Sequence, residues 1–218
     1  NINNFLASIT VDGDEAGLAY IDISTSEFTT SQFPINQIHT ELTRISPSEI
    51  LVSDITKKLI TSTKTTITIL DSEAFDQNQT KETLLNHFNV TSLEAYGCDH
   101  LPLAIASAGS ILDYLNLKQK IFVPHINSLS TYSTSSYMTL DSQTRRNLEL
   151  YESGRWNSSS ASLLSVLDFT KTPMGGRLFK RWISQPLLDL KQIIQRQEGV
   201  SWFHNNALRR GRIISILR

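Results

Sequence analysis

The sequence predicts an α/β domain with a mixed sheet and flanking helices, followed by a mainly α-helical partial domain. Three observations support this fold class. Strand patterns rich in β-branched and aromatic residues open the chain, helical and strand patterns then alternate, and only helical patterns follow Asp141. Residues 121–140 contain no Asp, Glu, Lys or Arg and are dense in Ser and Thr, so we interpret them as extended segments that link two domains.

The first three predicted strands form an antiparallel meander. They span residues 4–11, 17–24 and 27–33, and Asp12-Gly13-Asp14-Glu15 supplies the first turn. Helices and strands then alternate: a helix from Pro34, a strand at Ile50–Val52, a short helix at 55–61, a strand at 65–70 and a helix at 80–88.

A long apolar helix is predicted between Asp99 and Lys118. Asp99 is its expected N-cap, and Pro102 is tolerated within the first turn. Small residues, including Ala104, Ala108 and Gly109, keep this helix thin and favour close packing, so we expect it to complete the first domain.

Beyond the linking segment, Asp141 is expected to cap a helix that reaches about Glu152, with Arg145 and Glu149 paired at i, i+4. Asn157 to Ser160 reads as a polar loop. Asp189 and Gln192 then form a capping-box-like pair at the start of another helix, which Asn205-Asn206 ends, and a last helix begins near Ala207.

The stretch from Thr170 to Asp189 is the most informative helix of the chain. Thr172 is the expected N-cap, Pro173 takes the first helical position, and Pro186 ends the helix near Gln185. Met174, Leu178 and Trp182 recur at i, i+4 and i+8, so we expect them to face inward. A glycine costs about 1 kcal/mol in a helix, so we predict that Gly175 is largely buried against another element.

Composition bounds the class of protein. The 218 residues carry a net charge of −1, but residues 1–140 hold 7 basic and 15 acidic side chains and residues 141–218 hold 13 and 6. An acidic half and a basic half suggest mutual attraction, or attraction of the basic half to nucleic acid. No apolar run is long enough to span a bilayer, and the lone Cys98 is expected to be buried.

The sequence favours no catalytic centre. It lacks phosphate-loop, dinucleotide-binding, nucleophile-elbow and zinc-protease motifs, and its five histidines (His39, His87, His100, His125 and His204) have no ligand spacing. The alternative is a metal-dependent nuclease, because Asp22 lies on a central strand as in ribonuclease H-like folds. Glu41, Asp54 and Asp71 are the further carboxylates that a two-metal site would need.

Several blocks together resemble the MutS family of DNA mismatch-repair proteins. They are NFLASI from Asn4, GLAYIDISTSEF from Gly17, ELTRISPSEILV from Glu41, LEAYGCDHLPLAIASAGSILDYL from Leu93, QKIFVPHI from Gln119, YMTLDSQTRRNLEL from Tyr137 and SLLSVLDFTKTPMGGRLFKRWISQPLL from Ser162. The blocks stand in the family's order across nearly the whole chain. Ser26, where the family usually has glycine, and Tyr96, where it often has Phe, are minor departures.

The resemblance implies a layout and a set of signature residues. Residues 1–127 are similar to the family's connector domain, which has a ribonuclease H-like fold without nuclease activity, and residues 128–218 to the opening of its core or lever domain. The signature residues are structural: Thr144, Arg145, Arg146, Asn147, Pro173, Met174, Gly175, Arg177, Trp182 and Pro186. No catalytic, cofactor-binding or metal-binding residue is implied.

The resemblance also implies partners and context. A MutL-type protein would contact the connector. Mismatched double-stranded DNA, a second copy, and ATP with Mg²⁺ would be bound by the full-length parent, whose mismatch-reading, clamp and ATPase domains these residues do not match. The chain starts without Met or a signal peptide and ends within an apolar helical pattern, so we expect a fragment of a cytoplasmic, nucleoid-associated bacterial protein with no membrane contact. A third possibility is a free-standing nucleic-acid-binding module, which would use six basic residues: Arg177, Lys180, Arg181, Arg209, Arg210 and Arg212.

Overall fold

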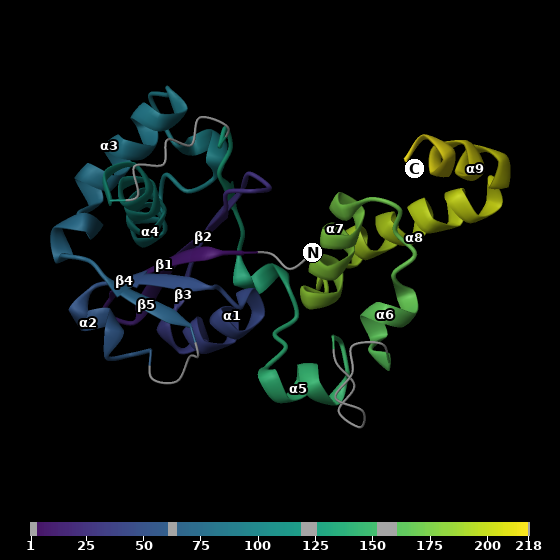
Figure 1. The fold of residues 1–218 in the computed structure, drawn as a ribbon, viewed down its shortest axis with the longest axis horizontal. Helices are drawn as coiled ribbons and strands as arrows, with labels where there is room; N and C mark the ends of the chain where they lie inside the picture. The colour runs from purple at the N-terminus through teal and green to yellow at the C-terminus, as the bar shows by residue number, and fades with distance from the viewer. Residues whose placement is uncertain (1–3, 61–64, 119–125, 152–160, 218) are drawn as a thin grey trace. The chain divides into compact units, whose positions relative to one another are not determined.

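The computed structural model describes residues 4–60, 65–118, 126–151 and 161–217. It divides into two units, one ending at Thr134 and the other beginning at Ser135. The first unit, which we call the sheet unit, holds a mixed sheet with helices on both faces. The described part of the second, which we call the helical unit, is mainly helical (Figure 1). The predicted fold class is therefore confirmed.

The sheet of the first unit has six strands in the order β5-β4-β1-β2-β3-β6. The strands are β1 (Leu6–Asp12), β2 (Glu15–Asp22), β3 (Glu27–Pro34), β4 (Glu49–Val52), β5 (Thr66–Ile69) and β6 (Ser130–Thr131). The strands β1, β2 and β3 pair antiparallel, which confirms the predicted meander. The other pairings, β1 with β4, β4 with β5, and β3 with β6, are parallel.

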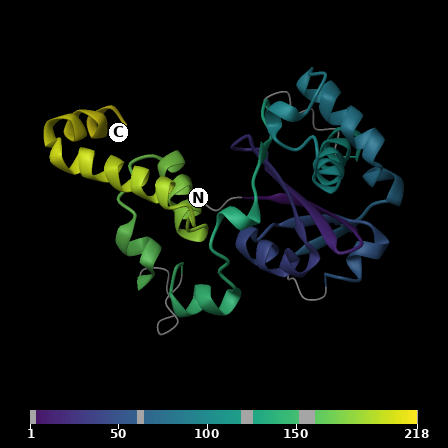
Figure 2. The ribbon, with the colours of Figure 1, turned by 180° about the vertical axis from the view of Figure 1, so that it is seen from behind.

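Helices cover both faces of this sheet (Figures 1 and 2). On one face lie α3 (Gln77–Phe88) and α4 (Pro102–Asp113), and on the other lies α1 (Ile38–Ile45). Successive residues of a strand point to opposite faces. Accordingly, Ile21 belongs to the apolar cluster that includes α4 residues, whereas Leu18 and Tyr20 belong to the cluster that includes α1 residues. The short helix α2 (Asp54–Lys57) follows β4.

Helix α4 is the most deeply buried helix of the unit, with every residue from Leu103 to Leu112 buried. Its approach to its neighbours depends on glycines. A Cβ added to Gly17 of β2 would lie 2.1 Å from the Leu103 carbonyl oxygen of α4, and one added to Gly109 of α4 would lie 2.4 Å from the Thr80 Cβ of α3. The predicted close packing of this helix is thus confirmed, against β2 on the sheet and against α3 beside it.

Several predicted boundaries of the first unit were wrong. Asp99 does not cap α4: Leu101 holds the N-cap position without a side-chain bond, while Asp99 pairs with Lys81 at 3.0 Å. Helix α3 begins at Gln77 because Asp76 caps it, which the apolar pattern alone did not indicate. A π-helical turn (Tyr114–Lys118) continues α4, and 3₁₀ turns lie at Ile35–Gln37, Ser72–Phe75, Glu94–Tyr96 and Thr134–Ser136.

The second unit contains α5 (Ser142–Asn147), α6 (Leu163–Leu167), α7 (Pro173–Ser184), α8 (Leu190–Asn205) and α9 (Ala207–Ile216). The predicted N-caps are confirmed, since Asp141, Thr172 and Asp189 each accept a bond from a first-turn N–H. The predicted length of α5 was wrong: this helix ends at Asn147, and Glu149 has a left-handed φ of 48°. Arg145 and Glu149 therefore do not lie on one continuous helix, as the predicted i, i+4 pairing required. The predicted helix end at Glu152 and the predicted loop at Asn157–Ser160 lie outside the described residues.

The apolar faces of the second unit are exposed, which corrects the expectation that the stripe of α7 faces inward. Met174 is 74% exposed, Leu178 43% and Trp182 39%. On the neighbouring helices, Val200, Leu208 and Ile216 are also exposed. Amphipathic periodicity predicts that a face is suited to burial, but the described elements of this unit cover these side chains only in part, as where Arg196 of α8 lies over the Trp182 ring.

Candidate functional site

The signature residues bring together two blocks that are about 40 residues apart in the sequence. Arg145 is buried, and its guanidinium donates from Nε to the Leu140 carbonyl at 2.9 Å and from Nη2 to the Ser184 carbonyl at 3.1 Å. Ser184 is the last residue of α7. Arg145 therefore connects the segment before α5 to the carboxyl end of α7, where the carbonyls of the last turn lack helical N–H partners and favour a cation.

Backbone bonds continue this connection beyond α7. The Met138 N–H donates to the Pro186 carbonyl at 2.8 Å, and Tyr137 forms an isolated antiparallel bridge with Leu187. We call Arg145 with these paired segments the Arg145 joint. It contains two of the signature residues, Arg145 and Pro186, and it fixes the direction in which the chain leaves α7.

The other signature residues lie at helix ends and surfaces. Thr144 donates its N–H to Asp141 Oδ1 at 2.6 Å, and Asn147 Oδ1 accepts from Gln143 Nε2 at 2.8 Å. Arg146 and Pro173 are exposed, and Arg177 is partly buried. These positions cap and start helices, and they do not converge on one pocket.

Gly175 is only partly buried, so the predicted burial against another element was wrong. A Cβ at this position would lie 3.1 Å from Thr172 Oγ1 and 3.3 Å from the Thr170 Cβ. The Gly175 N–H also donates to Thr172 Oγ1 at 3.1 Å. The close approach is therefore local: the residues that cap α7 fold over its first turn.

The carboxylates considered for a nuclease site do not form a metal-binding group among the described residues. Asp22 is buried, and its Oδ1 accepts from the Ser24 N–H at 2.9 Å and the Ser24 hydroxyl at 2.6 Å. Asp54 and Asp71 are exposed. The described residues contain no group of three or more His, Cys, Asp or Glu side chains that could hold a metal ion. The geometry of the described part thus does not assemble the set that two-metal chemistry needs.

Glu41 belongs to a different constellation, a cluster in which Glu41 and Tyr20 are buried and Arg44 and Tyr132 are partly buried. Arg44 donates from Nε and Nη2 to Glu41 Oε2 at 3.1 and 2.7 Å. The Tyr132 hydroxyl also donates to Glu41 Oε2, and Arg44 Nη2 donates to that hydroxyl at 2.9 Å. Sequence reasoning missed this cluster, because its members are up to 112 residues apart in the chain, from Tyr20 to Tyr132. The available signal was the polar pair Glu41 and Arg44 beside the apolar residues of α1.

Cys98 and the described histidines occupy ordinary core and surface positions. Cys98 is buried, as predicted, and burial raises the pKa of its thiol. His87 Nε2 lies 2.9 Å from the Ile126 carbonyl oxygen, while His39, His100 and His204 are exposed. His125 lies outside the described residues.

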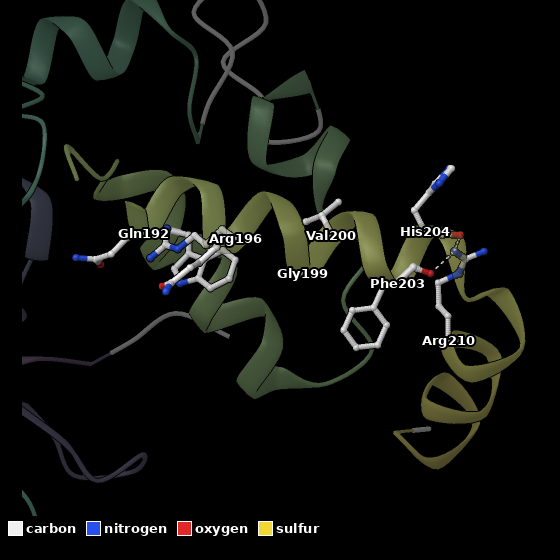
Figure 3. Close-up of a pocket in the computed structure, with 9 residues that line it drawn as sticks. Gln192, Arg196, Gly199, Val200, Phe203, His204 and Arg210 are labelled. Atoms are coloured by element: carbon white, nitrogen blue, oxygen red, sulfur yellow. Dashed lines mark hydrogen bonds between the residues drawn. The ribbon is translucent and has the colours of Figure 1, made fainter. Parts of the chain in front are cut away.

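A groove of about 710 Å³ lies on the second unit along α8 (Figure 3). Its lining includes Trp182, Arg196, Val200, Phe203 and Arg210. Arg196 covers the Trp182 ring at 4.0 Å from its centroid, and Arg210 Nη1 donates to the Phe203 and His204 carbonyls at 2.8 and 3.0 Å. The groove is mostly apolar and holds no converging catalytic groups among its lining residues.

Several basic residues proposed for nucleic-acid binding have intramolecular roles. Lys180 lies over the Tyr151 ring at 5.5 Å, and Arg209 over the Trp202 ring at 5.6 Å. Arg210 caps the carboxyl end of α8 through the two carbonyl bonds described above. Cation–π contacts of this kind contribute about 0.5–1 kcal/mol each at exposed sites, so these side chains stabilise the helical unit itself.

The chain folds as a sheet unit followed by a helical unit, and comparison with known families also matches it in two successive parts. Residues 4–127 match the family model described as MutS domain II, and residues 143–218 match that of MutS domain III. The chain belongs to the MutS family. Among the described residues, no helix combines the length and apolar character needed to cross a membrane.

Curated relatives are similar over nearly the whole chain. The DNA mismatch repair protein MutS of Dehalococcoides mccartyi (strain CBDB1) is 43% identical over 209 residues, which are 95% of this chain and 24% of the relative. Those of Synechocystis sp. (strain ATCC 27184 / PCC 6803 / Kazusa) and Trichormus variabilis are 42% and 38% identical, over 95% and 99% of this chain and 26% and 27% of the relatives. The chain thus spans about a quarter of the length of these relatives.

Proposed function

We propose that this chain supplies the connector and the opening lever helices of a DNA mismatch repair protein. In this role, residues 1–127 are the connector and residues 128–218 begin the lever. The chain carries a signal between mismatched DNA and the ATPase domain and performs no chemistry of its own. The family match and the names of the relatives support the mismatch-repair assignment.

The single observation that supports the transmission role best is the Arg145 joint. It ties the start of the helical unit to the far end of α7 through buried hydrogen bonds to Leu140 and Ser184. A hydrogen bond to a charged group contributes about 1.5–3 kcal/mol, roughly twice a neutral one. Such a joint allows movement at one end of α7 to be passed to the segment that leads to the connector.

The partners of the proposed role follow from the complete protein. The connector offers a surface to a MutL-type protein, and its acidic character suits a partner with a basic patch. Mismatched double-stranded DNA, a second copy and ATP with Mg²⁺ are bound elsewhere in the full-length protein. We place this protein in the cytoplasm, associated with the bacterial nucleoid.

A chimera tests the proposal. The chain would replace the corresponding quarter of MutS from Dehalococcoides mccartyi, and the readouts would be mismatch binding, ATP hydrolysis and capture of MutL from the same organism. We expect the chimera to bind mismatched DNA and to retain stimulation of ATP hydrolysis by it. A chimera that binds mismatches and hydrolyses ATP without any dependence of one on the other would contradict the transmission role.

A variant of the joint sharpens this test. Arg145→Met removes two buried donors and leaves the Leu140 and Ser184 carbonyls without them, at a cost of about 1–3 kcal/mol. In the chimera we expect about a tenfold loss of the stimulation by mismatched DNA, with basal ATP hydrolysis unchanged. Arg146→Met, at the exposed neighbouring position, is the matched control and should leave both rates unchanged.

DNA affinity separates this role from that of a free-standing nucleic-acid-binding module. Because Lys180, Arg209 and Arg210 are engaged within the helical unit, we expect the 218-residue chain to bind duplex DNA weakly at physiological salt. Nanomolar binding with a steep salt dependence would favour the binding module instead.

A further inference from the structure

The strand β5 forms an outer edge of the sheet. It stands at one end of the strand order, and among the described strands only β4 pairs with it. The Leu70 N–H donates to the Val52 carbonyl at 2.9 Å, so this N–H and, two residues back, that of Thr68 point toward β4. The N–H and C=O groups of the alternate residues, Ile67 and Ile69, therefore point away from the sheet, where no described strand meets them.

Contacts on both faces of β5 hold this strand in place. Thr68 Oγ1 donates to Glu49 Oε1 of β4 at 2.6 Å, and the Tyr114 hydroxyl donates to the same oxygen at 2.8 Å. On the opposite face, Ile67 packs against the apolar cluster that contains α1 residues. Because the strand is fixed before any partner arrives, its outward row of N–H and C=O groups is a preformed surface for another strand.

The sequence of this edge favours pairing with a copy of itself. Residues 65–70 read Thr-Thr-Ile-Thr-Ile-Leu, and Thr66 and Ile69 are exposed. Segments of about six residues with high strand propensity, no charge and no proline pair readily with identical segments. Natural edge strands are commonly protected by a charged residue or a proline, and this segment has neither.

The segment is complementary to itself when two copies run antiparallel about a two-fold axis. With the axis at Ile67, this residue faces Ile67 of the second copy, Thr66 faces Thr68, and Thr65 faces Ile69. Threonines then meet on one face of the joined sheet, and Ile67 meets its copy on the other, both favourable cross-strand pairs. The outward residues Thr65, Ile67 and Ile69 would exchange about six main-chain hydrogen bonds.

The charges that flank the segment favour this antiparallel direction. In the sequence Lys64 precedes it and Asp71 follows it. Antiparallel pairing brings the lysine end of one copy to the aspartate end of the other, whereas parallel pairing would bring like charges together. Asp71 is exposed, and Lys64 lies outside the described residues.

We propose that residues 65–69 form a contact between two copies of this chain, which joins their sheets through antiparallel β5 strands. The contact is small beside the roughly 1,200–2,000 Å² of a stable interface, so it is weak unless another contact already holds two copies together. Each copy has one β5, so the pairing closes at two copies. The contact is additional to the dimer contact of the full-length protein and does not depend on the transmission role.

Amide hydrogen exchange of the 218-residue chain, resolved by residue with NMR, tests the contact at increasing protein concentration. At low micromolar concentration we expect Ile67 and Ile69 to exchange freely, while Thr68 and Leu70, bonded to β4, are protected. At millimolar concentration the exchange of Ile67 and Ile69 should slow at least threefold, with Thr68 and Leu70 unchanged. Sedimentation equilibrium of the same samples should show the dimer. Association through the apolar faces of the helical unit would not produce this alternating pattern.

Variants of the edge sharpen the test. Ile67→Pro removes the central outward N–H and leaves the bonds to β4 in place, and Ile69→Lys puts a charge on the edge at an exposed position. We expect either variant to abolish the concentration-dependent protection. Ile55→Lys, at an exposed position of α2, is the matched control and should retain it.

Three results would overturn the contact. The first is a chain that remains monomeric at millimolar concentration. The second is association that leaves the exchange of Ile67 and Ile69 unchanged, which would assign the dimer to another surface. The third is protection that survives in Ile69→Lys, which decides the matter if Ile67→Pro fails to fold. Because no DNA, ATP or MutL is present, these results are independent of the chimera experiment.

Discussion

The two units of this chain bury their apolar residues to very different extents. In the sheet unit, Ile21, Leu51 and Ile111 are fully enclosed between sheet and helices. In the helical unit, Phe169, Met174 and Leu208 are 79%, 74% and 87% exposed. Helix formation in both units follows from local caps and periodicity, but stability follows from burial. The comparison shows that the sheet unit has its own core and that the described part of the helical unit, residues 135–151 and 161–217, buries few apolar side chains.

The largest expected effect is in the packing of α4 on β2. Gly17→Ala places a Cβ 2.1 Å from the Leu103 carbonyl oxygen, a backbone atom that cannot move without shifting α4. We expect a loss of about 3 kcal/mol or more in the free energy of unfolding of the sheet unit, by overpacking. Urea denaturation followed by circular dichroism measures this loss. A change below 0.5 kcal/mol, on the order of an ordinary surface substitution, would mean that α4 is not packed as described.

A smaller effect of opposite sign is expected at Asp113, the carboxyl end of α4. Asp113 Oδ1 accepts from Thr83, whereas Oδ2 is buried and has no hydrogen-bond partner among the described residues. Burial raises the pKa of this carboxyl, so the folded state binds its proton more tightly than the unfolded state. The contribution of Asp113 to the free energy of unfolding therefore falls as the pH rises from the pKa of this carboxyl in the unfolded chain through its higher pKa in the folded state.

Asp113→Asn removes the partly buried charge and keeps an acceptor for Thr83. We expect it to stabilise the sheet unit by about 1 kcal/mol at neutral pH, and the advantage to disappear as the pH falls below the folded pKa. Unfolding measured from pH 3 to 8 follows this difference. An advantage that is the same at every pH would contradict the assigned cause.

The smallest expected effect is that of a glycine-to-alanine substitution in the helical unit, which is compared with Gly17→Ala in the sheet unit. A Cβ at Gly199 of α8 would meet no heavy atom within 4 Å among the described residues, in contrast to Gly17. Gly199→Ala should therefore stabilise α8 by about 0.5–1 kcal/mol through helix propensity. Helical content of the chain and its thermal unfolding would show the gain. A loss of stability would indicate that α8 is packed at this position.

The comparison also explains which parts of the fold were predictable from sequence. The strands of the meander and the caps Asp141, Thr172 and Asp189 were predicted correctly, because alternation and capping are local. Asp99 was assigned wrongly, because its partner Lys81 lies on another helix. The left-handed Ser26, at φ 58°, sits where the family usually has glycine, so the resemblance marked the turn even though the residue differs.

The candidate sites were less predictable than the fold. The signature blocks identified the family, but the pattern could not show that Arg145 bonds the end of α7. The stripe of α7 indicated a face suited to burial, whereas the structure shows Met174 exposed; periodicity does not say which element covers a face. The cluster of Glu41, Arg44 and Tyr132 depends on a tertiary contact between distant segments: the sequence shows the pair Glu41 and Arg44 on one helix, but it does not show that Tyr132 meets them.

Hydrogen exchange across the unmodified 218-residue chain tests the central claim most directly, namely that the sheet unit has a buried apolar core and that the described helices of the other unit leave their apolar faces largely exposed. We expect amides of β1, β2 and α4 to exchange at least a hundredfold more slowly than those of α7, α8 and α9, because their opening requires loss of the sheet core. Equal protection of the two sets would contradict the account, since it would mean that the helical unit is as well packed as the sheet unit.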